Sequence, residues 1–130
     1  MASGLFLIAD DSEGKRLMLR ALLRHLHWDS EILMARTTEE AKKLIDAHPD
    51  IAHAFIDYEM PSENGPAVIA YLKAKNPSAR IALVSSSDSE RYTSEAKAAG
   101  AEICICTSRE SDEVEQTMKS VVETWKTIEN

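Results

Sequence analysis

The sequence predicts one α/β domain built on a doubly wound parallel sheet, and three observations predict it. Five short apolar segments recur along the chain, a longer amphipathic segment follows each of them, and the apolar segments are continuous rather than alternating in polarity. Continuous apolar strands are typical of parallel sheets buried on both faces. Regular alternation of strands and helices is typical of helices that cover both faces of such a sheet.

The elements follow in order along the chain. The expected strands are Leu5–Ala9, Ile32–Ala35, Ala52–Ile56, Ile81–Val84 and Ile103–Cys106. The apolar faces expected for the helices are Leu17, Met18, Ala21, Leu22, Leu23 and Leu26; Ala41, Leu44 and Ile45; Val68, Ile69 and Leu72; Ala96, Ala98 and Ala99; and Val114, Met118, Val121, Val122 and Trp125. Thr37 or Thr38 is expected to cap the second helix, Asn76-Pro77 to end the third, and Gly100 to end the fourth.

Length and composition indicate a single globular domain over residues 1–130. The chain is 44% hydrophobic and 28% charged, which is ordinary for such a domain. A net charge of -7 argues against binding to nucleic acid or to an anionic membrane. No apolar run approaches the roughly 20 residues that span a bilayer, and Met1–Gly4 does not begin a signal peptide. We therefore expect a cytoplasmic protein.

Several cysteine, histidine and tryptophan residues are interpreted as structural. Cys104 and Cys106 lie two apart in one expected strand, a spacing too constrained for an ordinary disulfide. We expect reduced core residues, with a Cys-x-Cys metal or redox site as an alternative that lacks further ligands. The remaining members of the group are expected at helix ends, at the surface or at the edge of the core: His25, His27, His48, His53, Trp28 and Trp125.

Polar residues follow four of the five expected strands. Asp10 and Asp11 follow the first strand, Asp57 the third, Ser85 the fourth, and Thr107 the fifth. Ligands bind outside the carboxyl ends of the strands in open parallel sheets, so these side chains are expected to converge. Taken singly, each has an ordinary interpretation as a helix cap or a loop residue.

Three converging carboxylates predict a magnesium site and phosphoryl chemistry. Their mutual repulsion is relieved by a bound cation, and hard oxygen ligands suit Mg²⁺. A divalent ion among carboxylates is what phosphoryl transfer needs, because the transferred group is anionic. Asp57 can then act as a nucleophile that forms an aspartyl phosphate, and Ser85 can donate a hydrogen bond to a phosphoryl oxygen.

These motifs, in this order and at this spacing, resemble the receiver domain of two-component response regulators. The segments that carry the resemblance are Ala9–Ser12 with Arg16, Phe55–Pro61 with Asn64-Gly65, Asn76-Pro77 leading to Ile81–Ser85, and Ala98–Ala101. The resemblance covers most of the chain. It implies a CheY-like, flavodoxin-like (βα)5 fold with the strand order 2-1-3-4-5.

The resemblance also implies a role for each site residue. Asp57 would be phosphorylated by a histidine kinase or a histidine phosphotransfer protein in a phosphorelay. Asp11, Asp57 and the backbone carbonyl of Glu59 would bind Mg²⁺, with Asp10 acting through water. Ser85 would report the phosphoryl group to the surface around the fourth helix and the fifth strand and helix. The protein would be a monomer or weak dimer whose effector is not indicated, and not a turnover enzyme.

The sequence departs from the family at two positions. Thr107 stands where the family has a lysine, and no lysine occurs between Gly100 and Arg109. The missing cation would pair with the phosphoryl group and with Asp57, and Arg109 is the candidate replacement, with a solvated surface residue as its other interpretation. Cys104 stands near the position of an aromatic residue of the family, whose rotation couples to the hydroxyl at the position of Ser85. These departures predict an atypical receiver.

Two alternatives remain beside a phosphorylated receiver. The first is a pseudo-receiver that binds partners without phosphorylation, which the two departures favour and the three carboxylates oppose. The second is a small Mg²⁺-dependent phosphatase with Glu59 as a second acid. Against it stand the lack of room for a cap domain and the expected lack of a lysine near the pocket.

Overall fold

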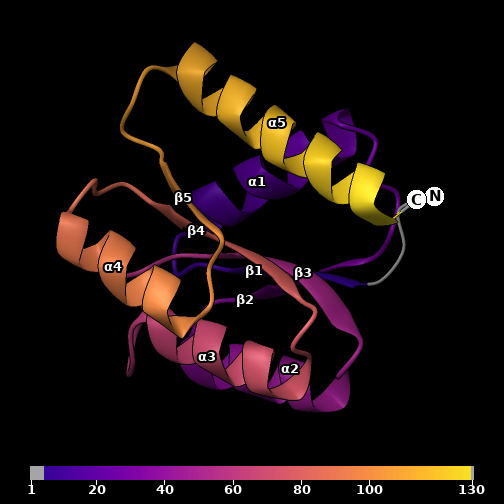
Figure 1. Cartoon of the computed structure of the whole chain (residues 1–130), viewed down its shortest axis with the longest axis vertical. Coiled ribbons are helices and arrows are strands. Elements are labelled where there is room, and N and C mark those ends of the chain that lie inside the picture. Colours follow the sequence, from indigo (N-terminus) through magenta and orange to yellow (C-terminus); the bar gives the residue numbers. More distant parts are fainter. Residues whose placement is uncertain (1–4, 130) are drawn as a thin grey trace.

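Five parallel strands form one sheet in the order β2-β1-β3-β4-β5 (Figure 1). The strands are β1 (Leu5–Ala9), β2 (Ile32–Ala35), β3 (Ile51–Ile56), β4 (Arg80–Ser85) and β5 (Ile103–Cys106). The helices are α1 (Glu13–His25), α2 (Thr38–Ala47), α3 (Gly65–Lys75), α4 (Glu90–Ala99) and α5 (Ser111–Glu129). The predicted doubly wound, flavodoxin-like fold and its strand order are confirmed. Three strands have the predicted bounds, and β3 and β4 are longer by one and two residues.

The structure is a computed structural model that describes residues 5–129, with side chains through Thr127. Met1–Gly4, from which we inferred the lack of a signal peptide, lies outside the described residues. Within the described range, no helix has the length and apolar character needed to cross a bilayer.

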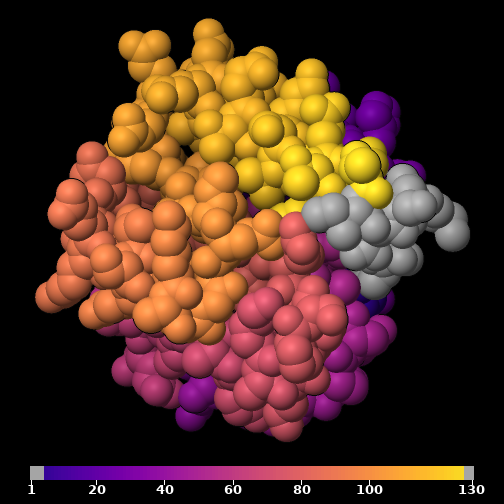
Figure 2. All heavy atoms as spheres, in the orientation of Figure 1, coloured from indigo at the N-terminus to yellow at the C-terminus, as the bar shows by residue number. Residues whose placement is uncertain are grey.

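The helices cover the two faces of the sheet unequally. α1 and α5 lie on one face, and α2, α3 and α4 lie on the other (Figure 1). Each face has its own buried cluster, one that includes Ile45, Ile69 and Leu83 and another that includes Phe6 and Val122. In Figure 2 the surfaces of α5 and of the α4–β5 segment adjoin on one side of the molecule. Burial on both faces accounts for the continuous apolar strands of the sequence.

The helix ends agree with the predicted capping signals. Thr37 caps α2, with its side chain accepting a hydrogen bond from the Glu40 amide at 3.0 Å. Asn76 is the C-cap of α3. Gly100 ends α4 with a φ of 129°, a conformation that only glycine adopts readily. Thr37 thus begins α2 soon after β2 ends, whereas Asn76 and Gly100 end helices shortly before β4 and β5 begin.

The apolar face predicted for α1 was partly wrong. Leu17 and Met18 are 43% and 47% exposed, whereas the residues of α1 that are buried are Arg16, Leu19 and Leu23. Apolar residues occur on several sides of this helix, so periodicity alone does not identify the face that meets the sheet. The placement of the whole helix decides which face is buried.

The interpretation of three aromatic or histidine residues was also wrong. Trp28 and Trp125 are fully buried rather than at the edge of the core, and His53 lies buried on β3 rather than at the surface. The His53 ring packs edge-on against Trp28 with 4.6 Å between centroids, and Phe6 lies beside it. The expected strand Ala52–Ile56 already contained His53, and its burial follows from its place in a strand that is covered on both faces. His25, His27 and His48 lie at helix ends, as expected.

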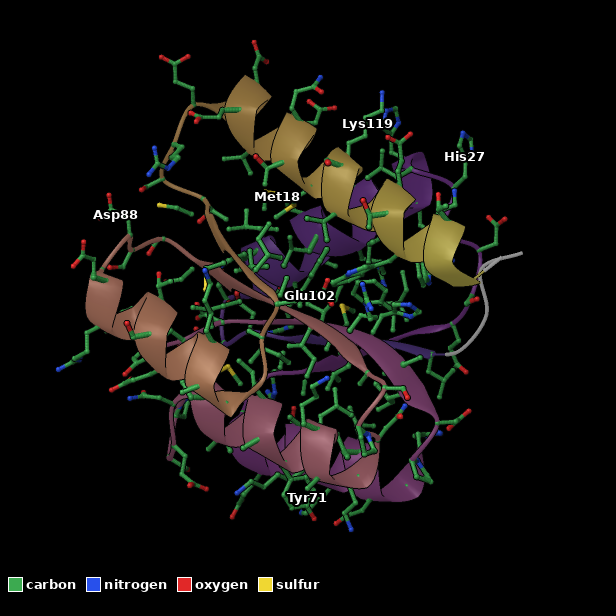
Figure 3. All side chains as sticks on the ribbon, viewed as in Figure 1. Met18, His27, Tyr71, Asp88, Glu102 and Lys119 are labelled. Carbon is green, nitrogen blue, oxygen red and sulfur yellow. The ribbon has the colours of Figure 1, made fainter. Side chains whose placement is uncertain are left out.

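The carboxyl ends of the strands form the edge that carries the polar residues. Ala9 of β1 is paired in register with Ile56 of β3, so Asp10 and Asp57 leave neighbouring strands at the same level. The Asp57 amide donates to the Ala9 carbonyl at 2.8 Å. In Figure 3, Asp88 of the β4–α4 loop lies toward this edge, and His27, which follows α1, lies at the opposite edge.

Candidate functional site

A cavity of about 230 Å³ opens at the carboxyl ends of β1, β3 and β4. Its lining residues are Asp10, Asp11, Ser12, Lys15, Asp57, Glu59, Ser85 and Ser86. The structure therefore brings together the predicted acidic pair, Asp57, Glu59 and Ser85. Thr107 is not among the lining residues.

Three carboxylates converge in the cavity, as predicted. Asp10, Asp11 and Asp57 each place one carboxylate oxygen within 4.8 Å of the other two. Asp10 is buried, Asp57 is partly buried and Asp11 is exposed. This donor set is hard, anionic and open to solvent on one side, so it fits a divalent ion such as Mg²⁺ that retains water ligands.

A lysine lies among the carboxylates, and the expectation that none is near the pocket was wrong. The Lys15 ammonium lies 2.9 Å from Asp10 Oδ2 and 3.3 Å from Asp57 Oδ1. It also donates to the Val84 carbonyl at 2.7 Å. The Lys15 side chain is only 16% exposed, so this cation is held in the cavity rather than in bulk solvent.

The start of α1 explains why Lys15 points into the cavity. Ser12 caps the helix, and its Oγ accepts a hydrogen bond from the Lys15 amide at 3.2 Å. Asp10 Oδ1 accepts from the Ser12 amide at 2.9 Å, and Arg16 donates to the Asp10 carbonyl at 2.8 Å. The first turn is therefore fixed against the end of β1 on both sides of Lys15. The four-carbon stem of Lys15 then spans the distance to Asp57.

Burial raises the pKa of the Asp57 carboxyl from its ordinary value of 3.8 to about 6. The Lys15 charge and hydrogen bond and the Tyr58 amide oppose this shift, whereas the neighbouring Asp10 carboxylate adds to it. Desolvation and like charge together disfavour the ionised form more than Lys15 favours it. An additional cation in the cavity would favour ionised Asp57.

Gly65 allows the chain after Asp57 to return close to the site. A Cβ atom at Gly65 would lie 2.0 Å from the Asp57 carbonyl oxygen, which no side chain can tolerate. The Gly65 amide donates to the Tyr58 carbonyl at 2.7 Å. The β3–α3 loop therefore requires glycine here for close backbone approach.

The polar ends of β4 and β5 lie at different distances from the cavity. Ser85 is buried at the cavity wall, and its Oγ accepts from the Ser87 amide at 3.1 Å. Thr107 donates its amide to the Ser85 carbonyl at 2.8 Å. Arg109 is exposed and lines a different cavity, beside Cys104 and other residues of β5 and α5. In the part of the chain that the structure describes, Lys15 rather than Arg109 contacts Asp57.

Two stacked tyrosines connect the mouth of the cavity to α4. Tyr92 of α4 donates its hydroxyl to the Glu59 carboxylate at 2.9 Å. Its ring stacks on Tyr58, with 3.5 Å between centroids, and the Tyr58 hydroxyl bonds to Glu95. Both carboxylates raise the pKa of the tyrosine that they contact. The Glu59 carboxylate is therefore engaged by α4, and its backbone carbonyl is not involved in this contact.

Sequence reasoning missed Lys15 and the Tyr58–Tyr92 pair. A signal for Lys15 did exist: it stands three residues after Ser12, the cap of the helix that follows an acidic strand end. For Tyr92 no local signal exists, because its contact with Glu59 joins residues 33 apart in the chain.

Comparisons with known proteins identify a family and agree with the fold. The family model of the response regulator receiver domain matches residues 6–119. A CheY-like receiver domain protein from Methanospirillum hungatei JF-1 superposes with a TM-score of 0.79 at 17% identity, over 97% of this chain and 98% of that chain. A chain of the CheX-CheY-BeF3-Mg complex from Borrelia burgdorferi gives 0.77 at 24% identity, over 91% and 88%.

A third solved structure is a response regulator from Burkholderia pseudomallei with a phosphorylated aspartic acid, a calcium ion and citrate. It gives a TM-score of 0.69 at 24% identity, over 98% of this chain and 75% of that chain. At these identities the structural matches show the fold alone. A comparison with curated proteins found no match.

Proposed function

The chain belongs to the response regulator receiver domain family, and on this premise we propose that Asp57 accepts a phosphoryl group from a histidine kinase or a histidine phosphotransfer protein. One observation carries the proposal. The Asp57 carboxylate lies at the end of β3, in a cavity with two further carboxylates and an ammonium group. A carboxylate so placed is an available nucleophile, and the charges around it suit an anionic group and its metal ion.

In the proposed reaction, a carboxylate oxygen of Asp57 attacks the phosphorus of the donor. The bond from phosphorus to the donor breaks, and the donor leaves with the electron pair. Mg²⁺, held by Asp11, Asp57 and the backbone carbonyl of Glu59, would neutralise charge on the transferred group. Asp10 would act on the metal through water, which suits a carboxylate already engaged by the Ser12 amide and Lys15.

Ser85 is proposed to read the phosphoryl group. Its hydroxyl lies at the cavity wall, at the end of the strand next to β3. A hydrogen bond from the Ser85 hydroxyl to a phosphoryl oxygen would draw the end of β4 and the β4–α4 loop toward Asp57. Thr107, at the position of the family lysine, follows this movement through its backbone bond to Ser85.

The remaining features of the proposal concern the whole protein. We propose one receiver domain over residues 1–130, cytoplasmic, acting as a monomer or weak dimer. It would signal by conformational change or altered partner binding, without contacting nucleic acid or membrane. It would lose the phosphoryl group by its own hydrolysis and would not turn over a substrate.

Phosphorylation by acetyl phosphate tests the proposal. Acetyl phosphate with Mg²⁺ is expected to add one phosphoryl group, detected by intact mass and assigned to Asp57 by peptide mapping. Asp57→Asn is expected to abolish the addition, and Asp11→Ala to reduce it by weakening Mg²⁺ binding. Absence of any mass increase at high acetyl phosphate would reject the proposal.

A magnesium titration separates this function from a pseudo-receiver. Calorimetric binding of Mg²⁺ that is lost in Asp11→Ala supports the phosphorylated receiver, and no binding supports the pseudo-receiver. The presence of Lys15 removes one objection to a phosphatase, so hydrolysis of a generic phosphomonoester needs its own assay. No turnover is expected, because the Glu59 carboxylate is engaged by Tyr92.

A further inference from the structure

Lys15 bridges the carboxyl ends of three neighbouring strands. Its ammonium contacts Asp10 after β1, Asp57 after β3 and Val84 near the end of β4, and β3 lies between the other two strands in the sheet. An ammonium group has three donors, and these three oxygen partners match that number. Lys15 is thus an integral part of the cavity wall, held by three oxygen atoms, rather than a solvated surface lysine.

The charges in the cavity permit Lys15 and a divalent ion to be present together. Asp10, Asp11 and Asp57 carry three negative charges when ionised, and Lys15 neutralises one of them. The two charges left over are those that one divalent ion neutralises. The ammonium is also next to Val84, immediately before Ser85, so it lies on the side of Asp57 where the serine hydroxyl is found.

The fifth strand offers no cation to this place. Thr107 meets the site through its backbone bond to Ser85, and Arg109 lines a separate cavity with Cys104 and Glu113. In the described part of the chain, a positive charge therefore reaches Asp57 from the first turn of α1, the helix that follows β1.

From this geometry we propose that Lys15 is the phosphoryl-binding cation of the protein, supplied by the first turn of α1 instead of by β5. When Asp57 is phosphorylated, the Lys15 ammonium pairs with a phosphoryl oxygen and keeps its bond to the Val84 carbonyl. Lys15 then favours transfer by stabilising charge on the group that is being transferred. The inference rests on the proposed function of Asp57 and adds a residue that contacts the transferred group.

Two probes test this role: phosphorylation by acetyl phosphate, and binding of beryllofluoride, a phosphoryl mimic, followed by ¹⁹F NMR. Both are measured with saturating Mg²⁺ on the full chain. Lys15→Met, which keeps the stem and removes the charge, is expected to slow phosphorylation and weaken beryllofluoride binding by about 10–100-fold, below the full effect of an enclosed oxyanion donor because the cavity is open. Lys15→Arg, which keeps the charge, is expected to retain part of the phosphorylation rate and part of the affinity for beryllofluoride.

Arg109→Met is the matched control, since it removes the cation nearest in sequence to Thr107, and Arg109 lines a separate cavity. It is expected to change both quantities by less than about twofold, as for a surface residue away from the site. The double variant Lys15→Met/Thr107→Lys places a lysine on the fifth strand, and it is expected to recover at least part of what Lys15→Met loses. Thermal unfolding and Mg²⁺ titration of each variant establish that the fold and the metal site persist.

A different result for Lys15→Met would overturn the proposed role of Lys15. If Lys15→Met binds Mg²⁺ more tightly and is phosphorylated as fast as the parent or faster, Lys15 only occupies the space of the metal and the inference is overturned. That outcome leaves Asp57 as phosphoacceptor intact, because the parent protein is still labelled there. Failure of the proposed function appears instead as a parent protein that acetyl phosphate does not label.

Discussion

At the scale of single residues, the surroundings of Asp57 disfavour the ionised form of its carboxyl group. Its carboxylate is largely removed from solvent and lies near that of Asp10, so its pKa rises although Lys15 lies beside it. A carboxyl whose pKa is raised in the folded state destabilises the fold when it ionises. Protonation of Asp57, a bound metal ion or a substitution that removes the charge would each abolish or reduce this cost.

Asp57→Asn is therefore expected to stabilise the protein in the absence of divalent ions. The folded protein binds the Asp57 proton more tightly than the unfolded chain does, so this group costs stability as pH rises from about 4 to about 6. The cost is fully present above that range. The gain in Asp57→Asn is expected to be about 1–2 kcal/mol at about pH 8, discounted for the exposed part of the carboxylate. It should vanish near pH 4.

Urea unfolding of the parent and Asp57→Asn at several pH values measures this difference. A gain that is the same at every pH would contradict the assignment to ionisation of Asp57. Added Mg²⁺ is expected to reduce the advantage of Asp57→Asn, because the metal binds the folded parent and stabilises it.

Two glycines provide a matched pair at the same scale. Gly65→Ala is expected to destabilise the protein by about 3 kcal/mol, because its Cβ meets the Asp57 carbonyl at 2.0 Å and the loop must shift. Gly14→Ala in the first turn of α1 is expected to stabilise it by about 0.5–1 kcal/mol, since its Cβ comes no closer than 4.0 Å to Ser12 Oγ. Chemical denaturation gives both signs, and equal effects would contradict the close approach at Gly65.

At the scale of elements, α4 is connected to the cavity by side chains of α4 itself and of the β3–α3 loop. Cys104 is half-buried on β5 and has no ring to move between buried and exposed positions. The aromatic contact at this side of the molecule is instead Tyr58 on Tyr92, with Glu59 as hydrogen-bond acceptor. The β3–α3 loop and α4 are therefore coupled directly.

A double-mutant cycle measures this coupling. Tyr92→Phe and Glu59→Gln each disturb the same hydrogen bond, so their effects on unfolding free energy are expected to be non-additive by about 0.5–1 kcal/mol. Tyr92→Phe combined with Glu63→Gln is the control, because Glu63 pairs with Lys42 on α2. Additivity in both cycles would mean that the Tyr92–Glu59 bond contributes nothing in solution.

At the scale of the whole molecule, two separate cores hold the helices to the sheet. Trp125 joins the second half of α5 to the face shared with α1, and its ring lies 5.9 Å from the rings of Phe6 and of Phe55. The site is built at the edge between the two cores. Its geometry therefore depends on both helix layers being in place.

Trp125→Ala is expected to lower the free energy of unfolding by about 3–5 kcal/mol, the cost of deleting a large buried aromatic. Leu17→Ala is the control on the opposite helix of the same layer. Because Leu17 is 43% exposed, its loss is expected to cost less than about 0.5 kcal/mol. Urea unfolding followed by circular dichroism measures both, and similar losses would contradict the observed orientation of α1.

The sequence by itself determined the strands, their parallel arrangement and the residues at their carboxyl ends. Apolar runs, caps and glycines act over a few residues, so the sequence assigns Asp10, Asp57 and Ser85 to one edge of the sheet. Only the tertiary structure decided which face of α1 is buried and that the Lys15 ammonium lies beside Asp57. The physical reason is reach. The spacing from Ser12 places Lys15 in the first turn of α1, but the position of its ammonium depends on where the whole helix packs and on a long flexible stem.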